Sequence, residues 1–282
     1  MKTLNLPKIT YRQKEIIDLL YKHRYLTRLQ LQTFLKQKDK KNTYLWLKDL
    51  RAKGYIDWIY NKASFIDKST PAIYYLSKNA INRYRHFGVH DEAELHKRYK
   101  DHDRSKSFIE HCLLLADAGV TLDTFDETKN HIRTCYYYET EADYLGSGKY
   151  HFLADSEYIR PNLCFTKLRD DGMNEMEATE SYLLEIFDSE LPQYRLRYRL
   201  KQYVTYMDEE LGIWEDETYG DPKPVILLVC AKVSDLIYAK RRTRGLIADI
   251  WERDDEDRPD IRFTTTEKLK QHGVFADIWE KT

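Results

Sequence analysis

NTYLWLKDLRAKGYI, residues 42–56, joins a helix pattern to a strand pattern. Apolar and small side chains recur there at the three- and four-residue spacing of one helix face, which predicts a helix from about Asn42 to Lys53. The side chains expected to enter the core are Thr43, Trp46, Leu47 and Leu50. Gly54 is expected to end the helix, because glycine readily adopts the left-handed conformation that follows many helices. The strand pattern begins at Tyr55.

Two helix patterns precede this stretch, and a second strand pattern follows it. The first helix is expected over residues 10–25, and a short second helix from Thr27, a residue type that caps helix N-termini. The inward side chains expected in this second helix are Leu29, Leu31, Phe34 and Leu35. Strands are expected at Tyr55–Tyr60 and Ala72–Leu76, and a closing helix at about residues 78–86.

This order of three helices and a β-hairpin resembles a winged helix-turn-helix domain. The run Leu50–Ile56 resembles the end of a recognition helix that leads into the wing, and Ile73–Ser77 resembles the returning wing strand. Tyr25–Leu31 resembles the start of the helix before the recognition helix. The resemblance implies a DNA-binding domain over residues 1–88.

Charge is distributed unevenly along the 282 residues. Residues 1–90 hold 19 Lys and Arg against 6 Asp and Glu, while the remainder holds 27 basic and 41 acidic residues. The net charge of −1 therefore hides a basic N-terminal part and an acidic C-terminal part. Such asymmetry favours a polyanion-binding module at the N-terminal end.

The outward face of the helix at residues 42–53 is the candidate DNA surface, because a recognition helix presents such a face to the major groove. Asn42 is suited to an adenine edge, and Lys41 or Lys48 to guanine or phosphate. Lysines between the two strands are expected to touch the flanking DNA backbone. The predicted DNA-contacting residues are Lys41, Asn42, Tyr44, Lys48, Lys62 and Lys68. A solvated basic face and a protein-binding scaffold are the alternative interpretations.

Residues 89–104 are polar and are expected to form a linker to a second domain over residues 105–282. The predicted fold class of that domain is mixed α/β, so the whole chain is expected to have two domains, an α+β winged helix and an α/β domain. The continuous apolar run Val225–Ala231 is typical of a strand in the middle of a sheet. The helix pattern at residues 193–209 mixes cations with tyrosines, a composition that also suits nucleic acid.

Glu185 lies within a second apolar strand pattern, Tyr182–Asp188. A carboxylate at a buried strand position is costly unless it is paired, hydrogen-bonded or bound to a metal. Two interpretations follow for this residue. Either it pairs with Arg195 or Arg199, or it belongs to a metal-dependent site.

The element order resembles the restriction-endonuclease-like core, in which a helix precedes strands that carry the active site and a further helix follows. The residues that carry this resemblance are Arg160-Pro161-Asn162, the strand with Glu185, and the helix with Arg199-Leu200-Lys201. With the winged helix in front, the chain resembles the replication-relaxation family of bacterial plasmids and mobile elements. That resemblance implies a DNA-binding protein of replication or mobilisation, with double-stranded DNA as its partner.

The nuclease motif implied by this resemblance is incomplete. Asn162 stands where the first metal-binding acid would follow the proline, and Phe187 stands where a lysine would follow Glu185. We therefore expect a non-catalytic domain without metal or cofactor. The alternative is a magnesium-dependent nuclease or nickase, and its fallback residues are Glu185, Asp188, Lys201 and Glu110. A winged-helix transcription regulator is the third interpretation.

The chain lacks the glycine-rich phosphate-binding motifs, GxSxG, HExxH and paired CxxC cysteines, which argues against nucleotide-driven enzymes and zinc sites. Its longest apolar run is far shorter than the roughly 20 residues that span a bilayer. No apolar leader is expected at the N-terminus, and four scattered cysteines favour a reducing cytoplasm. A homodimer and contacts with replication or mobilisation proteins are left open as further partners.

Overall fold

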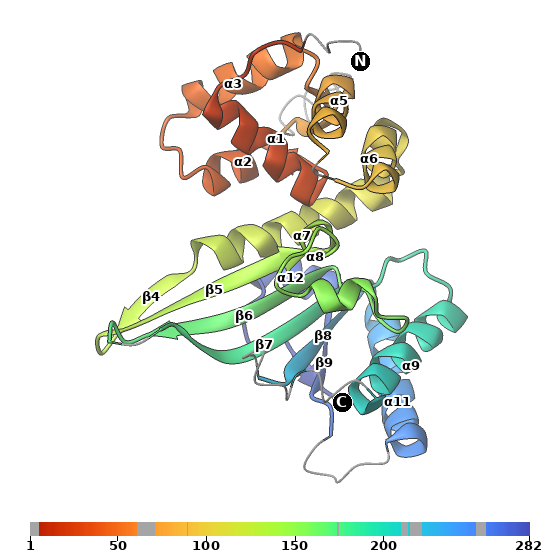
Figure 1. The fold of residues 1–282 in the computed structure, drawn as a ribbon. Coiled ribbons are helices and arrows are strands. Elements are labelled where there is room, and N and C mark those ends of the chain that lie inside the picture. The colour runs from red at the N-terminus through yellow and green to blue at the C-terminus, as the bar shows by residue number, and fades with distance from the viewer. Residues whose placement is uncertain are drawn as a thin grey trace. The chain divides into compact units, whose positions relative to one another are not determined.

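The computed structural model describes residues 6–60, 71–88, 90–173, 175–209, 214, 222–251 and 258–282. The chain divides into two compact units, Met1–Val120 and Thr121–Thr282 (Figure 1). The boundary falls inside helix α7 (Lys106–Thr124). The architecture is mixed α/β, as the sequence predicts.

The N-terminal unit combines helices with a small antiparallel sheet of order β1-β3-β2. The three expected helices, both strands of the hairpin and the closing helix are all present. In chain order its elements are α1 (Tyr11–His23), β1 (Leu26–Thr27), α2 (Arg28–Phe34), α3 (Lys40–Ala52), β2 (Ile56–Ile59), β3 (Ile73–Leu76), α5 (Lys78–Phe87), α6 (Glu92–Tyr99) and a 3-10 helix (Lys100–Asp103).

Local sequence signals account for where these helices begin and end. Thr10 caps α1 and Thr27 caps α2, each through a capping box with the glutamine three residues later, Gln13 or Gln30. The predicted cap at Thr27 is thereby confirmed. After α3, Gly54 has a φ of +68°, a conformation that glycine adopts without the strain of a Cβ atom.

Helices α1 and α3 contribute to the core of the N-terminal unit together with the small sheet and α5. Ile16 and Leu20 of α1 and Leu47 and Leu50 of α3 are almost fully buried. The structure corrects two expected core positions. Trp46 is only half-buried, since it flanks the buried stripe of α3 rather than lying on it. Leu29 of α2 is 51% exposed, because Leu31 and Leu35 are the leucines that this segment turns into the core.

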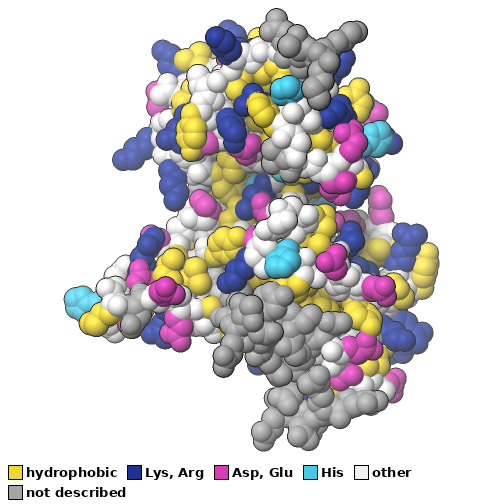
Figure 2. Space-filling model, viewed as in Figure 1, with side chains coloured by type: hydrophobic (Ala, Val, Ile, Leu, Met, Phe, Trp, Pro, Cys, Tyr) yellow, Lys and Arg dark blue, Asp and Glu magenta, His cyan; other side chains and the backbone are white. Residues whose placement is uncertain are grey.

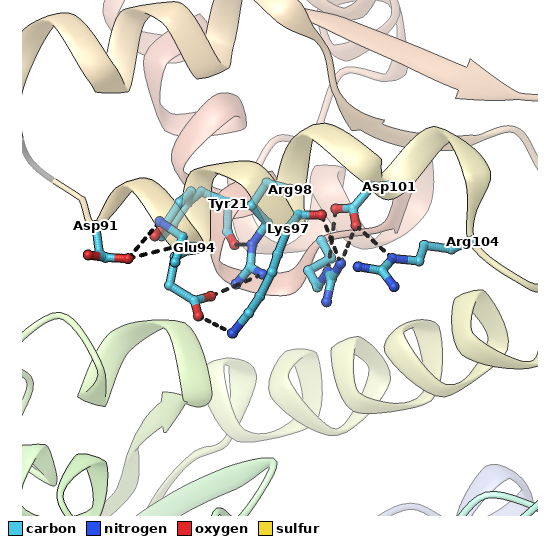
Figure 3. A network of polar contacts seen from close by, with 9 residues as sticks. Tyr21, Asp91, Glu94, Lys97, Arg98, Asp101 and Arg104 are labelled. Carbon is cyan, nitrogen blue, oxygen red and sulfur yellow. Dashed lines mark hydrogen bonds and ion pairs between the residues drawn. The ribbon is translucent and has the colours of Figure 1, made fainter.

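The predicted linker at residues 89–104 is wrong over the residues that the structure describes there. Instead of an extended connection, α6 and the 3-10 helix occupy residues 92–103 and bind to α1 (Figure 3). Arg98 is 5% exposed, and its Nε donates to the carbonyl of Tyr21 at 3.1 Å. The same guanidinium lies over the Tyr21 ring, 5.2 Å from its centroid.

Asp101 is the most buried charge in this attachment. Its side chain is fully buried, and both its carboxylate oxygens accept hydrogen bonds from the guanidinium of Arg24. The Tyr25 hydroxyl donates to the Asp101 backbone carbonyl, and Arg104 lies 3.9 Å from the carboxylate. The polar residues of this segment therefore form a buried ion pair with Arg24, just after α1, and a hydrogen bond to the α1 backbone. Composition alone cannot distinguish such a segment from a solvated linker.

The second unit is built on one mixed sheet of order β10-β9-β8-β7-β6-β5-β4. Strands β4 to β7 form an antiparallel meander, β7, β8 and β9 are parallel, and β10 is antiparallel to β9. The strands are β4 (Asp126–Lys129), β5 (Ile132–Thr140), β6 (Leu163–Asp170), β7 (Glu177–Ile186), β8 (Pro224–Cys230), β9 (Ile261–Thr265) and β10 (Glu280–Lys281). Its helices are α8 (Glu141–Tyr144), a 3-10 helix (His151–Ala154), α9 (Gln193–Glu209), α11 (Val233–Ile250) and α12 (Thr266–His272).

The apolar strand expected at residues 225–231 is β8, and it lies between β7 and β9 within the sheet. Leu228 of this strand shares a core with Leu200 of α9 and Ala239 of α11. Helices α9 and α11 lie side by side on the sheet (Figure 1). The run at residues 160–162 precedes β6.

We expect Leu50→Ala to destabilise the N-terminal unit by about 2–5 kcal/mol, because the substitution leaves a cavity in a filled core. Leu45→Ala is the matched control, since Leu45 lies on the same helix and is 47% exposed. Its effect should stay within about 0.5 kcal/mol. Chemical denaturation of the full chain measures both changes, and equal losses for the two variants would contradict this core assignment.

We expect Asp101→Ala to lower the free energy of unfolding by about 3–5 kcal/mol, because it leaves the Arg24 guanidinium without its buried carboxylate. Asp103→Ala is the control, since Asp103 lies in the same 3-10 helix with its side chain 79% exposed. Thermal unfolding of the full chain compares the variants. A loss no larger for Asp101→Ala than for the control would restore the interpretation of this segment as a linker.

Candidate nucleic-acid interface

Four of the six predicted DNA-contacting residues lie together on the exposed face of α3. Lys41, Asn42 and Lys48 are exposed, and the Tyr44 side chain is 50% exposed. They face outward because Thr43, Leu47 and Leu50 take the buried face of the same helix. The other two predicted residues, Lys62 and Lys68, lie outside the described residues.

Helix α3 is held in place from both sides. The Asp49 carboxylate accepts hydrogen bonds from Gln13 Nε2 of α1 and from Lys53 Nζ, each at 2.6 Å. The hydrogen bond from Lys53 lowers the pKa of Asp49, so the carboxylate stays charged. Toward β2, the Arg51 guanidinium lies 3.7 Å from the centre of the Trp58 ring. These contacts fix the direction in which α3 presents its outer face.

The electrostatic character of this helix is positive. Within its 13 residues, α3 carries four cations, Lys40, Lys41, Lys48 and Arg51, and a single carboxylate, Asp49. Because that carboxylate is already bonded to Gln13 and Lys53, it offsets little of the field over the outer face. Figure 2 shows further Lys and Arg side chains over the visible surface of the N-terminal unit.

The second candidate site is centred on Glu185 of β7. Its side chain is 6% exposed, and Oε1 accepts hydrogen bonds from Arg199 Nε at 2.9 Å and from Arg199 Nη2 at 2.7 Å. Burial, and after it the negative charge of Glu185, raise the pKa of Tyr203 well above its usual value. The predicted pairing of Glu185 with Arg199 is confirmed. Arg195 instead donates from Nε to the Tyr194 hydroxyl at 3.2 Å.

Asn162 ties the start of β6 to the end of β7. The side-chain Oδ1 of Asn162 accepts a hydrogen bond from the backbone N–H of Ile186 at 2.8 Å. The backbone N–H of Asn162 donates to the Leu184 carbonyl at 2.9 Å. The Asn162 side chain is therefore hydrogen-bonded to the backbone of β7, at the residue after Glu185. Phe187 is buried in the core, and its amide donates to the Val229 carbonyl at 2.8 Å.

Of the four fallback catalytic residues, Glu185 is buried and the other three are exposed. Asp188 is exposed beyond the end of β7, and Lys201 is exposed on α9. Glu110 belongs to the N-terminal unit, where it is exposed and lies 3.6 Å from Lys106. Among the described residues, no group of three or more His, Cys, Asp or Glu side chains is arranged to hold a metal ion.

A second buried carboxylate of this unit, Glu139 of β5, was not predicted from the sequence. It is 2% exposed and accepts hydrogen bonds from the amides of Lys149 at 2.6 Å and Tyr150 at 3.2 Å. Gly148 lies directly against this carboxylate, and a Cβ atom there would collide with it. The two closely spaced glycines at positions 146 and 148 are the signal in the sequence that a backbone passes close to another group.

Supercoiled plasmid incubated with the protein and magnesium or manganese should remain supercoiled. The reason is that Glu185 is already bonded to Arg199, and Asn162 supplies no charge for a metal ion. Glu185→Ala should give the same plasmid result and cost about 1.5–3 kcal/mol of stability, since Arg199 loses a charged hydrogen-bond partner. Glu190→Ala, at an exposed position, is the control. Nicking that disappears in Glu185→Ala and persists in Glu190→Ala would instead support the nuclease.

In the parts of the chain that the structure describes, no helix is both long and apolar enough to cross a membrane. No curated protein and no solved structure matches the chain. A family model described as replication-relaxation matches residues 17–219, a span that includes the candidate surface of α3 as well as Asn162, Glu185 and Arg199. The chain belongs to the replication-relaxation family.

Proposed function

We propose that this chain is a DNA-binding protein of plasmid or mobile-element replication or mobilisation, and that it grips duplex DNA through a winged helix in its N-terminal unit. The observation that carries the proposal is the exposed face of α3, on which Lys41, Asn42, Tyr44 and Lys48 lie together. Family membership supports the replication role. The order α1, β1, α2, α3, β2, β3 supports the winged-helix assignment.

The chemistry of α3 suits duplex DNA in two ways. A helix fits the major groove of B-form DNA, and side chains on its outer face then reach base edges. The Asn42 amide matches the paired donor and acceptor of adenine, while Lys41 and Lys48 supply charge for phosphates or guanine. The hydrogen bond from Gln13 of α1 to Asp49 supports this role, because a reading helix must keep its orientation.

For the second unit, we propose a degenerate restriction-endonuclease-like domain that serves in assembly or in a second DNA contact. The chain order β5, β6, β7, α9, β8 supports the fold assignment. The bonding of Glu185 to Arg199 and the use of Asn162 in joining β6 to β7 support the loss of catalysis. Magnesium enters this proposal only if the plasmid experiment above shows nicking.

Binding of a fluorescent duplex to the full chain should weaken steeply with salt. Six phosphate contacts would give a log–log slope of roughly −5. Lys41→Glu combined with Lys48→Glu should abolish most binding at low salt and reduce the slope, because two cations leave the DNA-facing surface. Fluorescence anisotropy over a series of salt concentrations measures both quantities.

The matched control is Lys106→Glu combined with Lys270→Glu, which changes the net charge by the same amount at exposed lysines of α7 and α12. This control should retain duplex binding. Equal losses in the two double variants would show that only total charge matters. Binding that survives the α3 changes and ignores salt would remove α3 as the DNA-reading helix.

A further inference from the structure

The N-terminal half of α9 presents two aromatic side chains to solvent. Tyr194 is 68% exposed and Tyr198 is 62% exposed, although tyrosine normally buries most of its ring. Their spacing of four residues places them on the same side of the helix, about 6 Å apart along its axis. The opposite side of α9 is anchored in the core by Leu196, Leu200 and Tyr203.

Cations surround these two rings. Arg195, Arg197 and Lys201 are exposed, and α9 contains no acidic residue before Asp208. Arg199 is the exception among the basic residues of this half of the helix, because its guanidinium is turned to Glu185. Figure 2 shows Lys and Arg side chains next to hydrophobic ones over α9, at the right of the view.

Open hollows flank the tyrosine pair, and both rings line each of them. The first has a volume of about 640 Å³, and Leu191 and Arg195 contribute to its wall. The second has a volume of about 450 Å³ and lies between α9 and α11, where Arg197 and Lys201 face Asp249. Both volumes fall within the range of pockets that hold small organic groups. Asp249 is outnumbered by the two cations opposite it.

We propose that the α9 tyrosine face, formed by Tyr194, Arg195, Arg197, Tyr198 and Lys201, binds single-stranded nucleic acid. Unpaired bases stack on the two rings and enter the flanking hollows, while the cations contact the phosphates. This site deepens the second DNA contact proposed for this unit, on which it rests, and it takes a different form of nucleic acid from the duplex gripped by α3.

Two observations favour a single strand over other occupants. Stacking on an exposed ring needs a free base face, and the bases of an intact duplex cover one another. A protein partner would have to meet three cations that have no neighbouring acid on α9, whereas the phosphates of a single strand neutralise all three. The charge of this face is complementary to a polyanion, and its rings are complementary to bases.

The test uses the full chain and a fluorescein-labelled oligothymidine of about 20 nucleotides, long enough to cover one such face. Tyr194→Ala combined with Tyr198→Ala should weaken binding at least about tenfold, since stacking on each ring is lost. Replacing both tyrosines by Phe should retain most of the affinity, because the rings remain. Tyr11→Ala combined with Tyr99→Ala, at exposed tyrosines of other helices, should retain it fully.

We expect variants of one surface to leave binding at the other surface intact. The α3 charge reversals should weaken duplex binding and leave the oligothymidine affinity within about twofold, while the α9 alanine variants should do the reverse. An oligouridine of the same length tells a DNA-selective site from one that accepts either strand chemistry, and tight binding of either supports the proposal. No binding of either oligonucleotide, or an alanine variant that binds as well as the native chain, would overturn it. So would phenylalanine variants as weak as the alanine variants.

Discussion

The ion pair between Glu185 and Arg199 joins β7 to α9. The orientation of α9 on the sheet and the state of the Glu185 carboxylate both depend on it. A carboxylate in the middle of a buried strand needs a partner, and the guanidinium supplies two hydrogen bonds to one of its oxygens. The bond orients α9 on the sheet, so that Leu196 and Leu200 enter the core and Tyr194 and Tyr198 stay outside. The same bond engages the buried carboxylate among the fallback residues of the nuclease alternative.

Buried charged side chains with specific partners also hold the N-terminal unit together, where they attach α6 and the 3-10 helix after it. Asp101 is buried against Arg24 and Arg98 against the backbone of Tyr21, and these bonds attach α6 and the following 3-10 helix to α1. Helix α1 in turn holds α3 through the hydrogen bond between Gln13 and Asp49. Orientation of the candidate DNA surface therefore depends on polar contacts as well as on the apolar core.

The two proposed surfaces differ in the form of nucleic acid that they suit. The exposed face of α3 is mostly cationic and amide-bearing, and it belongs to a narrow helix that fits a groove. The α9 tyrosine face offers stacking rings, which a closed duplex cannot use. A protein with both can hold paired and unpaired DNA at once, which is the situation wherever a duplex is opened during replication.

The sequence by itself determined the elements whose signals are local. The caps at Thr10 and Thr27, the apolar stripe of α3, the stop at Gly54 and the apolar strand β8 depend on neighbours a few residues away. It also offered Arg195 and Arg199 as partners of Glu185, beside the alternative of a metal site. The sequence resembles the replication-relaxation family, and the family match confirms that resemblance.

Only the tertiary structure decided which polar residues are buried and which partners they bind. Residues 92–103 are as polar as a linker, yet Arg98 and Asp101 are buried, because their partners Tyr21 and Arg24 come from more than 70 residues earlier in the chain. The choice of Arg199 over Arg195 follows from the packing of α9 on β7, and the exposure of Leu29 from the way α2 packs. A polar side chain is compatible with water or with a buried partner, and which of the two it meets is settled by segments far away in the sequence.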